Sequence, residues 1–282
     1  AGVSYEVVPG VTAAFAVLLG YPPNGQTAVI AAIVAAFLTV LFQIVTIVPR
    51  ARNSVRNVQP KYHHRQWLMV SLPIFVIEGF YFMLTNADVL VVGYFMPPGD
   101  VAVYFATTKI LALVHFVYFA VKAGVAQRYA HYAQDMKTGK LAGFARETVA
   151  WTFWPSLLMA LAVLVIGKPM LMMFGPGFEA GYPLLFVLVL GVIARSSVGP
   201  AESLLTMTGN QNICAVVYGI TLTVSIILNI ILIPLYGLWG AAITMTAALT
   251  CEAVLLAFTV WKRLGIVMIV PLIRAPRLQE NA

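Results

Sequence analysis

The sequence is short of charge. Only 10% of its 282 residues are Asp, Glu, Lys or Arg, against about 25% in an ordinary soluble domain, and 61% are hydrophobic. A water-soluble fold cannot hide that much apolar surface. The apolar residues also collect in runs near or above the roughly 18 to 20 residues that cross a bilayer. Lipid is therefore the expected solvent, and the sequence predicts an all-α, polytopic bundle of about eight transmembrane helices.

Cysteine is also scarce, and several catalytic motifs are missing. Cys214 and Cys251 both lie inside apolar runs, which argues against a disulfide framework and against a paired metal-ligand spacing. The chain has no phosphate-binding loop of the GxxxxGKS or GxxxxGKT type, no HExxH and no GxSxG motif. We therefore predict that the protein is not an enzyme and uses no cofactor and no metal.

What the sequence does have is a series of apolar segments separated by turn residues such as Pro97-Pro98-Gly99 and Gly175-Pro176-Gly177. The first segment carries Glu6 and Pro9 and is the least regular. The predicted spans are Val3–Leu19, Thr27–Val48, Trp67–Phe95, Val101–Val125, Val149–Ile166, Tyr182–Met207, Ile213–Leu235 and Ala241–Trp261. Between two of them, Arg128–Arg146 mixes charged and aromatic residues, which suits a short helix in the headgroup layer or a solvated linker helix.

The net charge of +7 is better explained by membrane topology than by a nucleic-acid partner, because the basic residues fall between the apolar runs. They gather in alternate loops, as the positive-inside rule expects of the cytoplasmic side. These residues are Arg50, Arg52, Arg56, Lys61 and Arg65 in the first such loop, Lys122, Arg128, Lys137, Lys140 and Arg146 in the second loop with its flank, and Lys262, Arg263, Arg274 and Arg277 in the tail. The C-terminal tail is therefore expected in the cytoplasm and, with eight spans, so is the N-terminus.

Ionisable side chains inside the spans are candidates for function, because each costs several kcal/mol in hydrocarbon unless it is paired or hydrated. A water-filled cavity carrying both signs of charge would accommodate them. The candidates for lining it are Glu78, Asn86, Asp88, Lys109, His115, Lys122 and Arg195. Glu78 and Asp88 lie ten residues apart on one predicted helix, close to three turns, so both can face the same side.

Structural roles compete with each of these functional ones. Asp88 and Lys109 would also suit an ion pair between adjacent helices, and His115 would suit a hydrogen-bonded packing position. Arg195 faces either a ligand phosphate or a paired Glu202 two turns along its helix. For Glu202 and Glu252 we expect positions near helix ends, with carboxylates that reach the interface and have no role.

From Trp67 to Ile266 the sequence resembles the polysaccharide-biosynthesis flippases of the multidrug/oligosaccharidyl-lipid/polysaccharide exporter superfamily. The resemblance rests on ordered landmarks, the most specific of which is the closing hairpin. The landmarks are Ser71-Leu72-Pro73, Asn86-Ala87-Asp88 with Val92-Gly93, Val103-Tyr104-Phe105-Ala106-Thr107, Leu171-Met172-Met173-Phe174-Gly175 with Phe178 and Gly181, Leu204-Leu205-Thr206-Met207-Thr208-Gly209-Asn210, and Leu228-Asn229, Leu232-Ile233-Pro234 and Gly237-Leu238-Trp239-Gly240-Ala241-Ala242. At one landmark the family's usual glycine is replaced by Ala102-Val103.

The resemblance implies a layout in which this chain is a C-terminal fragment of a longer, two-lobed transporter. Residues 1–50 would be the last two helices of an N-terminal lobe, 51–66 a basic cytoplasmic linker, 67–266 the C-terminal six-helix lobe and 267–282 a cytoplasmic tail. The expected location is the bacterial cytoplasmic membrane.

The implied function is to flip a lipid-linked oligosaccharide, carried on polyprenyl pyrophosphate, across that membrane by alternating access, without covalent chemistry. Lys109, Lys122 and Arg195 are the cations expected to meet the phosphates, while Glu78 and Asp88 would balance them or bind a coupling ion. Expected partners are the lipid-linked oligosaccharide, membrane lipids and glycan-assembly enzymes. The alternatives are a cation-coupled multidrug exporter of the same superfamily and a non-transporting membrane scaffold of glycan assembly.

Overall fold

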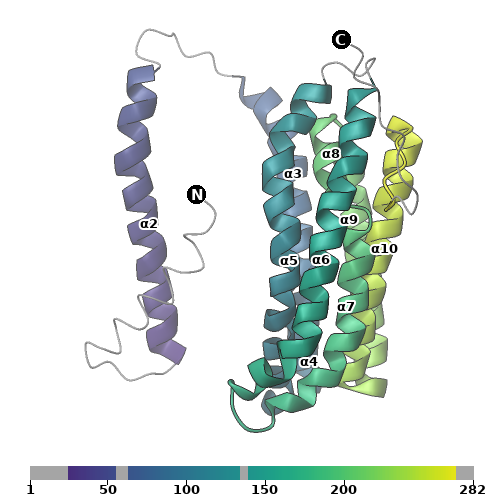
Figure 1. Cartoon of the computed structure of the whole chain (residues 1–282). Helices are drawn as coiled ribbons and strands as arrows, with labels where there is room; N and C mark the ends of the chain where they lie inside the picture. Colours follow the sequence, from purple (N-terminus) through teal and green to yellow (C-terminus); the bar gives the residue numbers. More distant parts are fainter. Residues whose placement is uncertain (1–24, 55–62, 134–138, 271–282) are drawn as a thin grey trace. The chain divides into compact units, whose positions relative to one another are not determined.

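The computed structural model describes residues 25–54, 63–133 and 139–270, and most of them are helical (Figure 1). This part of the chain contains seven helical spans that are long and apolar enough to cross a membrane. The predicted all-α, polytopic bundle is therefore confirmed for the described residues, whereas the first predicted span, Val3–Leu19, lies outside them. The chain divides into two units, Ala1–His63 and His64–Ala282, and each is described by itself.

The first unit contains helix α2 (Gly25–Ser54), whose membrane span is Val29–Pro49. Its exposed side chains are largely apolar, which suits contact with lipid. The hydroxyls of Thr39 and Thr46 donate to backbone carbonyls one turn earlier in the same helix. These two polar side chains are thus satisfied locally, as a lipid-exposed helix requires.

The second unit is a lobe of helices. Its elements are α3 (His64–Leu84), α4 (Ala87–Phe95), α5 (Pro98–Ala133), α6 (Lys140–Met172), the 3-10 helix η2 (Phe178–Gly181), α7 (Tyr182–Ser196), α8 (Ala201–Met207), α9 (Gln211–Tyr236) and α10 (Leu238–Leu264). Figure 1 shows α8 and α4 toward opposite ends of this lobe. Two of the predicted spans, Trp67–Phe95 and Tyr182–Met207, are each broken into two separate helices.

The first break separates α3 from α4 at Thr85 and Asn86, inside the span that the sequence predicts as one helix from Trp67 to Phe95. The Thr85 hydroxyl donates to the Tyr81 carbonyl, and the Asn86 amide donates to the Phe82 carbonyl. Side chains that satisfy backbone carbonyls in this way compete with continuation of the helix. They end α3 and allow α4 to begin at Ala87.

The second break separates α7 from α8. Gly199 has φ 62°, a left-handed conformation that glycine adopts without strain, and Pro200 follows it. A Cβ at Gly199 would also lie only 3.0 Å from the Cα of Val149 in α6, so the backbones approach closely here. Because the helix ends at this turn, the Gly199 carbonyl does not make the usual backbone hydrogen bond of a helix. The carbonyl can therefore accept a hydrogen bond from a side chain.

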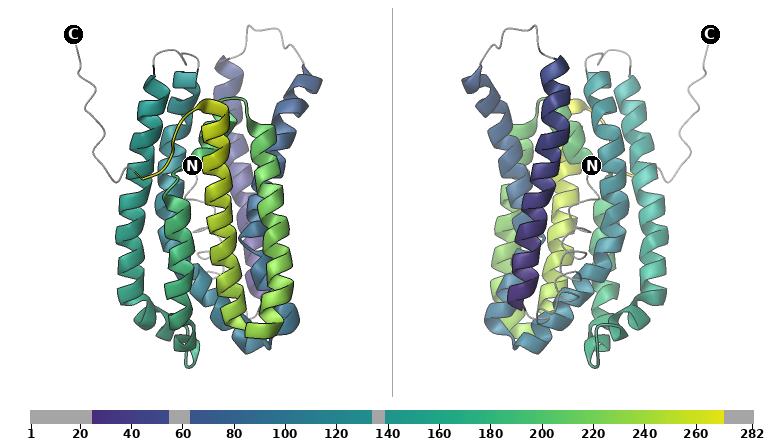
Figure 2. Two further views of the ribbon diagram at one scale, coloured as in Figure 1. Left: turned by 90° about the vertical axis from the view of Figure 1, so that its right-hand side faces the viewer. Right: turned by 90° about the vertical axis from the view of Figure 1, so that its left-hand side faces the viewer.

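Packing arranges the long helices in the order α3, α9, α10, α7, α6 and α5, each against the next. The α5 and α6 pair and the α9 and α10 hairpin are both visible in Figure 2. The hairpin is tight. Gly237 turns the chain at φ 57°, and a Cβ at Gly240 would overlap the backbone carbonyl of Leu232.

Two large apolar cores lie inside the lobe, one toward each end of the long helices. In α5, the buried apolar residues from Tyr104 to Val114 belong to one core, and Val125 and Tyr129 belong to the other. In α10, the first reaches Leu249 and the second begins at Ala253. Three charged side chains that lie between the cores, Arg195, Glu202 and Glu252, are buried.

The segment Arg128–Arg146 does not form the separate short helix that we expected. Its described residues belong instead to the end of α5 and the start of α6. The aromatic residues that suggested membrane contact pack inside the lobe, where Tyr129 and Phe144 lie with ring centroids 5.4 Å apart. Residues 134–138 lie outside the described part.

Candidate functional site: a buried chain of charged side chains

Arg195 lies in the last turn of α7, between the two cores, with 4% of its surface exposed. Its Nε is 2.5 Å from Oε1 of Glu252, and its Nη1 donates to the Gly199 carbonyl at 3.0 Å. Its Nη2 donates to the Tyr118 hydroxyl at 2.8 Å and to Oε2 of Glu202 at 2.7 Å. The planar fork of arginine allows one cation to satisfy acceptors from several helices at once.

Glu202 and Glu252 supply the two buried carboxylates of this cluster, from α8 and α10. The Tyr218 hydroxyl of α9 lies within hydrogen-bond distance of both, contacting Oε2 of Glu202 and Oε1 of Glu252, and shares its single proton between them. Our expectation that both carboxylates reach the interface is wrong, since both are enclosed. Glu202 does lie near a helix end, in the first turn of α8. Glu202 is held in the short helix that the break after Arg195 creates, and Glu252 lies in the middle of α10.

Lys122 of α5 extends the cluster toward the surface. Its Nζ lies 2.7 Å from Oε1 of Glu202 and 3.3 Å from Oε1 of Glu78 in α3. The Lys122 side chain is 25% exposed and that of Glu78 is 57% exposed, against 5% for Glu202. The charges thus alternate in sign from the exposed Glu78 through Lys122, Glu202 and Arg195 to the enclosed Glu252.

Lys122 lies close to both Glu202 and Glu78, so the charge balance of the buried part of the cluster depends on which of these two carboxylates Lys122 is counted with. Two buried carboxylates, Glu202 and Glu252, are matched by two cations, Arg195 and Lys122. Glu78 then adds one negative charge at the exposed end. Enclosed charges are tolerated only when they are paired and hydrogen-bonded, and all but one atom of the buried carboxylates meet that condition. The exception is Oε2 of Glu252, which has no hydrogen-bond partner in the described structure.

Three of the candidate residues predicted from the sequence therefore meet in one place, namely Glu78, Lys122 and Arg195. Of the two alternatives for Arg195, the pair with Glu202 is present. Tyr118 and Tyr218 were missed by the sequence analysis, because tyrosines in an apolar span give no pattern that separates packing from hydrogen bonding.

The other candidates lie apart from this cluster. Asp88 is buried and accepts hydrogen bonds from the Tyr104 hydroxyl at 2.6 Å and from the Val89 amide at 2.8 Å. Lys109 is exposed, with its Nζ 4.8 Å from the centroid of the Phe105 ring. The alternative of an Asp88–Lys109 ion pair is wrong, since the salt bridges of the described residues do not include it.

The structure also shows where the side chains of Glu78 and Asp88, Asn86 and His115 lie. Glu78 and Asp88 do not share one environment, because the helix breaks between them and only Asp88 is buried. Asn86 is part of that break and uses its amide on the Phe82 carbonyl. His115 is partly exposed on α5.

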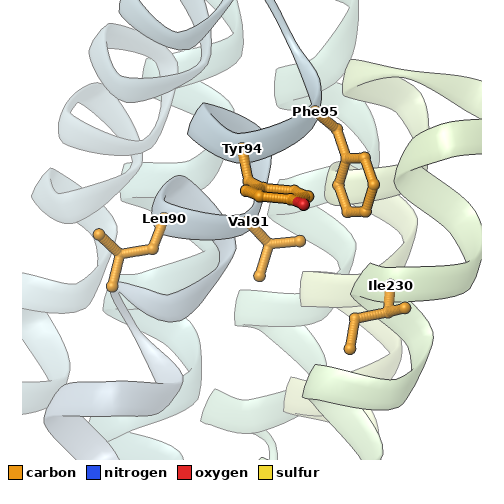
Figure 3. A pocket seen from close by; sticks show the side chains of 5 residues that line it. All are labelled: Leu90, Val91, Tyr94, Phe95 and Ile230. Carbon is orange, nitrogen blue, oxygen red and sulfur yellow. The ribbon is translucent and has the colours of Figure 1, made fainter.

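Two grooves on the surface of the lobe are apolar. One, of about 360 Å³, lies between α4 and α9 and is lined by Leu90, Val91, Tyr94, Phe95 and Ile230 (Figure 3). The other, of about 480 Å³, lies between α3 and α9 around Phe80 and Gly219. Such grooves on a membrane-spanning surface suit lipid chains rather than a charged head group. Among the described residues, no three His, Cys, Asp or Glu side chains are grouped so as to hold a metal ion.

Comparison with known proteins adds no relative to this description. No family model, no curated protein and no solved structure matches the chain. The function must therefore be argued from the helical lobe and its charged side chains.

Proposed function

We propose that this chain is part of a membrane transporter that flips a lipid-linked oligosaccharide, carried on polyprenyl pyrophosphate, across the bacterial cytoplasmic membrane. The observation that carries the proposal is the chain of charges from the exposed Glu78 through Lys122 into the lobe. Both residues lie within helices that are long and apolar enough to cross a membrane. An exposed charge at membrane depth is costly in lipid, so this surface is expected to face water, an anionic group or another polar protein surface.

Lysine side chains are the groups that we expect to meet the pyrophosphate. Lys122 is partly exposed, and Lys109 is exposed on the same helix. Both therefore have room to reach a ligand. Arg195 is expected to act indirectly, because its donors are already committed to Glu202, Glu252, Tyr118 and Gly199. In this proposal, Arg195 holds the Glu202 carboxylate in place, and Glu202 in turn positions Lys122.

The resemblance of residues 67–266 to polysaccharide-biosynthesis flippases supports the same proposal. In that scheme the lobe would work with a second lobe around a hydrated cavity, and rocking of the two lobes would move the sugar-pyrophosphate head across about 30 Å of hydrocarbon. The predicted orientation, with the C-terminal tail in the cytoplasm, would place Arg195 and Glu202 in the cytoplasmic half of the membrane.

Complementation tests the proposal. The full-length protein is expressed in a bacterium that lacks its own oligosaccharide flippase, and surface polysaccharide and accumulated lipid-linked precursor are measured. Restored polysaccharide with loss of the precursor is the expected result. A matched pair of variants, Lys122→Ala and Arg263→Ala, separates a role at the charge cluster from a general effect of basic residues, and only the first should abolish export. A correctly inserted protein that leaves the precursor trapped would reject flipping.

A second candidate function is a non-transporting membrane subunit that holds glycan-assembly enzymes together. The observation that favours it is the tight pairing of Arg195 with Glu202 and Glu252, in a lobe with apolar surface grooves. A scaffold would tolerate Lys122→Ala as long as the lobe stays folded. A scaffold would not restore export in a host that lacks a flippase, so a folded protein that leaves the precursor trapped would favour the scaffold, whereas export that persists in a folded Lys122→Ala variant would reject the role of Lys122.

A further inference from the structure

Oε2 of Glu252 stands out among the atoms of the charge cluster. The residue is enclosed, with 0% of its surface exposed, yet this oxygen has no hydrogen-bond partner in the described structure. Its other oxygen, Oε1, is bonded to Arg195 and Tyr218. A buried carboxylate oxygen without a protein donor is costly, and a bound proton lowers that cost by neutralising the group.

We propose that the Glu252 carboxyl binds one exchangeable proton, and that this proton decides whether Lys122 is held by Glu202 or is released to an anionic phosphate group. The proton is transferred from hydronium in bulk water, so that one O–H bond of hydronium breaks as one O–H bond forms on the carboxylate, and the charge of the cluster rises by one. The first half of the proposal concerns Glu252 alone, and the second half rests on the proposed flipping of a pyrophosphate-linked substrate.

The charges around Glu252 decide where the effect of the proton is felt. With Glu252 ionised, Arg195 and Lys122 face three carboxylates, Glu78, Glu202 and Glu252, and the cluster carries one net negative charge. With Glu252 protonated, the two cations balance Glu78 and Glu202, and the net negative charge that repels an incoming anion is gone. Of the two cations, only Lys122 is open to that anion, because its side chain is 25% exposed and that of Arg195 is 5% exposed. An anion reaching Lys122 would take the place of Glu78, which lies 3.3 Å from it.

The neighbours of Glu252 are compatible with proton exchange. The Tyr218 hydroxyl contacts both carboxylates and gives a hydrogen-bonded route from Glu202 to Glu252. The titratable or charged groups that interact with Glu252 from the packed helices are Tyr81 of α3, Tyr118 of α5, Arg195 of α7, Glu202 of α8, and Cys214 and Tyr218 of α9. Lys122 of α5 interacts with Glu202, and His115 of α5 interacts with Arg195. On α4, which also contacts α10, Asp88 is bonded to Tyr104.

Thermodynamic linkage gives the proposal a measurable form. If protonation of Glu252 favours binding of an anion at Lys122, then binding of the anion must favour protonation by the same factor. Coupling between two sites of one protein is commonly in the range of about 5- to 150-fold in affinity. We expect a value on the order of tenfold here.

The proton site is tested by infrared difference spectroscopy of the full-length protein in nanodiscs of phosphatidylcholine. The difference between acidic and alkaline buffer should contain the carbonyl band of a protonated carboxyl group. The band assigned to Glu252 should be missing in Glu252→Gln and present in the matched control Glu78→Gln. A spectrum of Glu252→Gln that equals the spectrum of the unmodified protein would overturn the proposal.

A second variant keeps the test decisive if Glu252→Gln does not fold. Tyr218→Phe leaves the carboxyl in place and removes one of its donors, so the band should remain and move in frequency. A band that does not move in Tyr218→Phe places the titrating carboxyl elsewhere and also overturns the proposal.

The effect on Lys122 is tested with inorganic pyrophosphate and calorimetry in the same nanodiscs. Pyrophosphate itself titrates, so the informative quantity is the affinity ratio between acidic and alkaline buffer in the unmodified protein, compared with the ratio in Glu252→Gln. The first ratio should exceed the second on the order of tenfold. Equal ratios would overturn the coupling. A Glu252 band in a protein that fails complementation would reject flipping and leave the proton site standing.

Discussion

The guanidinium of Arg195 in α7 contacts the carboxylate of Glu252 in α10, with Nε and Oε1 2.5 Å apart. The two residues are 57 positions apart in the chain, and both lie between the two apolar cores. Because removal of one partner leaves the other charge enclosed, this contact couples the stability of the lobe to the integrity of the charge cluster. We make four predictions. Two concern this charge cluster, one concerns the hairpin of α9 and α10, and one concerns the orientation of the lobe in the membrane.

Arg195→Ala should destabilise the lobe. Glu202 and Glu252 would lose their shared cation, and breaking a buried pair in this way costs about 3–5 kcal/mol. Arg195→Lys should be intermediate, because an ammonium keeps the charge but cannot replace the fork of donors. The measurement is thermal unfolding of the purified protein in detergent, followed by size-exclusion chromatography. Arg263→Ala, at the exposed end of α10, is the control. An Arg195→Ala protein as stable as this control would contradict the prediction.

Glu78 and Lys122 should make unequal contributions to stability. The Glu78 side chain is more than half exposed, so Glu78→Gln should change the free energy of unfolding by less than about 1 kcal/mol. Lys122→Gln also removes the partner of the enclosed Glu202, and a hydrogen bond to a charged group contributes about 1.5–3 kcal/mol. The two single variants and the double variant are compared in one thermodynamic cycle. A larger loss for Glu78→Gln than for Lys122→Gln would be the opposite of what we expect.

Gly240→Ala should destabilise the hairpin of α9 and α10. A Cβ at this position would overlap the carbonyl of Leu232, and the two helices would have to move apart. Overpacking of this kind costs about 1–3 kcal/mol. Gly124→Ala in α5 is the matched control, because a Cβ there meets nothing within 4 Å and alanine is the better helix former. Thermal unfolding should rank the control at or above the unmodified protein and Gly240→Ala below both.

Cysteine accessibility tests the expected orientation. In a chain whose two cysteines are replaced by alanine, Lys168→Cys at the exposed end of α6 should react with a membrane-impermeant thiol reagent in intact cells. Arg263→Cys, at the other end of the lobe, should react only after the cells are opened. This is what the positive-inside rule predicts from the basic loops. The reverse labelling pattern would invert the orientation of the lobe.

The membrane spans were predictable because hydropathy is a local property of the sequence. Five of the seven apolar runs predicted from Thr27 onward each coincide with one described helix, and the other two, Trp67–Phe95 and Tyr182–Met207, each coincide with two. The breaks inside the spans were harder to predict. At Thr85 and Asn86 the break depends on side chains that bond to backbone carbonyls one turn earlier, and both residue types also occur in unbroken helices.

The candidate site was only partly predictable for a related physical reason. A soluble helix marks its buried face by a stripe of apolar residues, but a helix that is apolar on all sides carries no such mark. The sequence therefore shows that Glu202 and Glu252 lie within or beside apolar runs without showing which way they face. Our expectation that they reach the interface failed for this reason, and Tyr118 and Tyr218 went unnoticed.

The sequence by itself determined that this protein is a bundle of membrane-spanning helices, where most of the spans lie and which side of the membrane each loop is expected to face. These follow from composition and from the order of residues along the chain. Only the tertiary structure decided which charges meet. The contact of Arg195 with Glu252, and the position of Lys122 between Glu78 and Glu202, depend on how each helix is rotated and packed against its neighbours. That rotation is set by contacts between residues far apart in the chain.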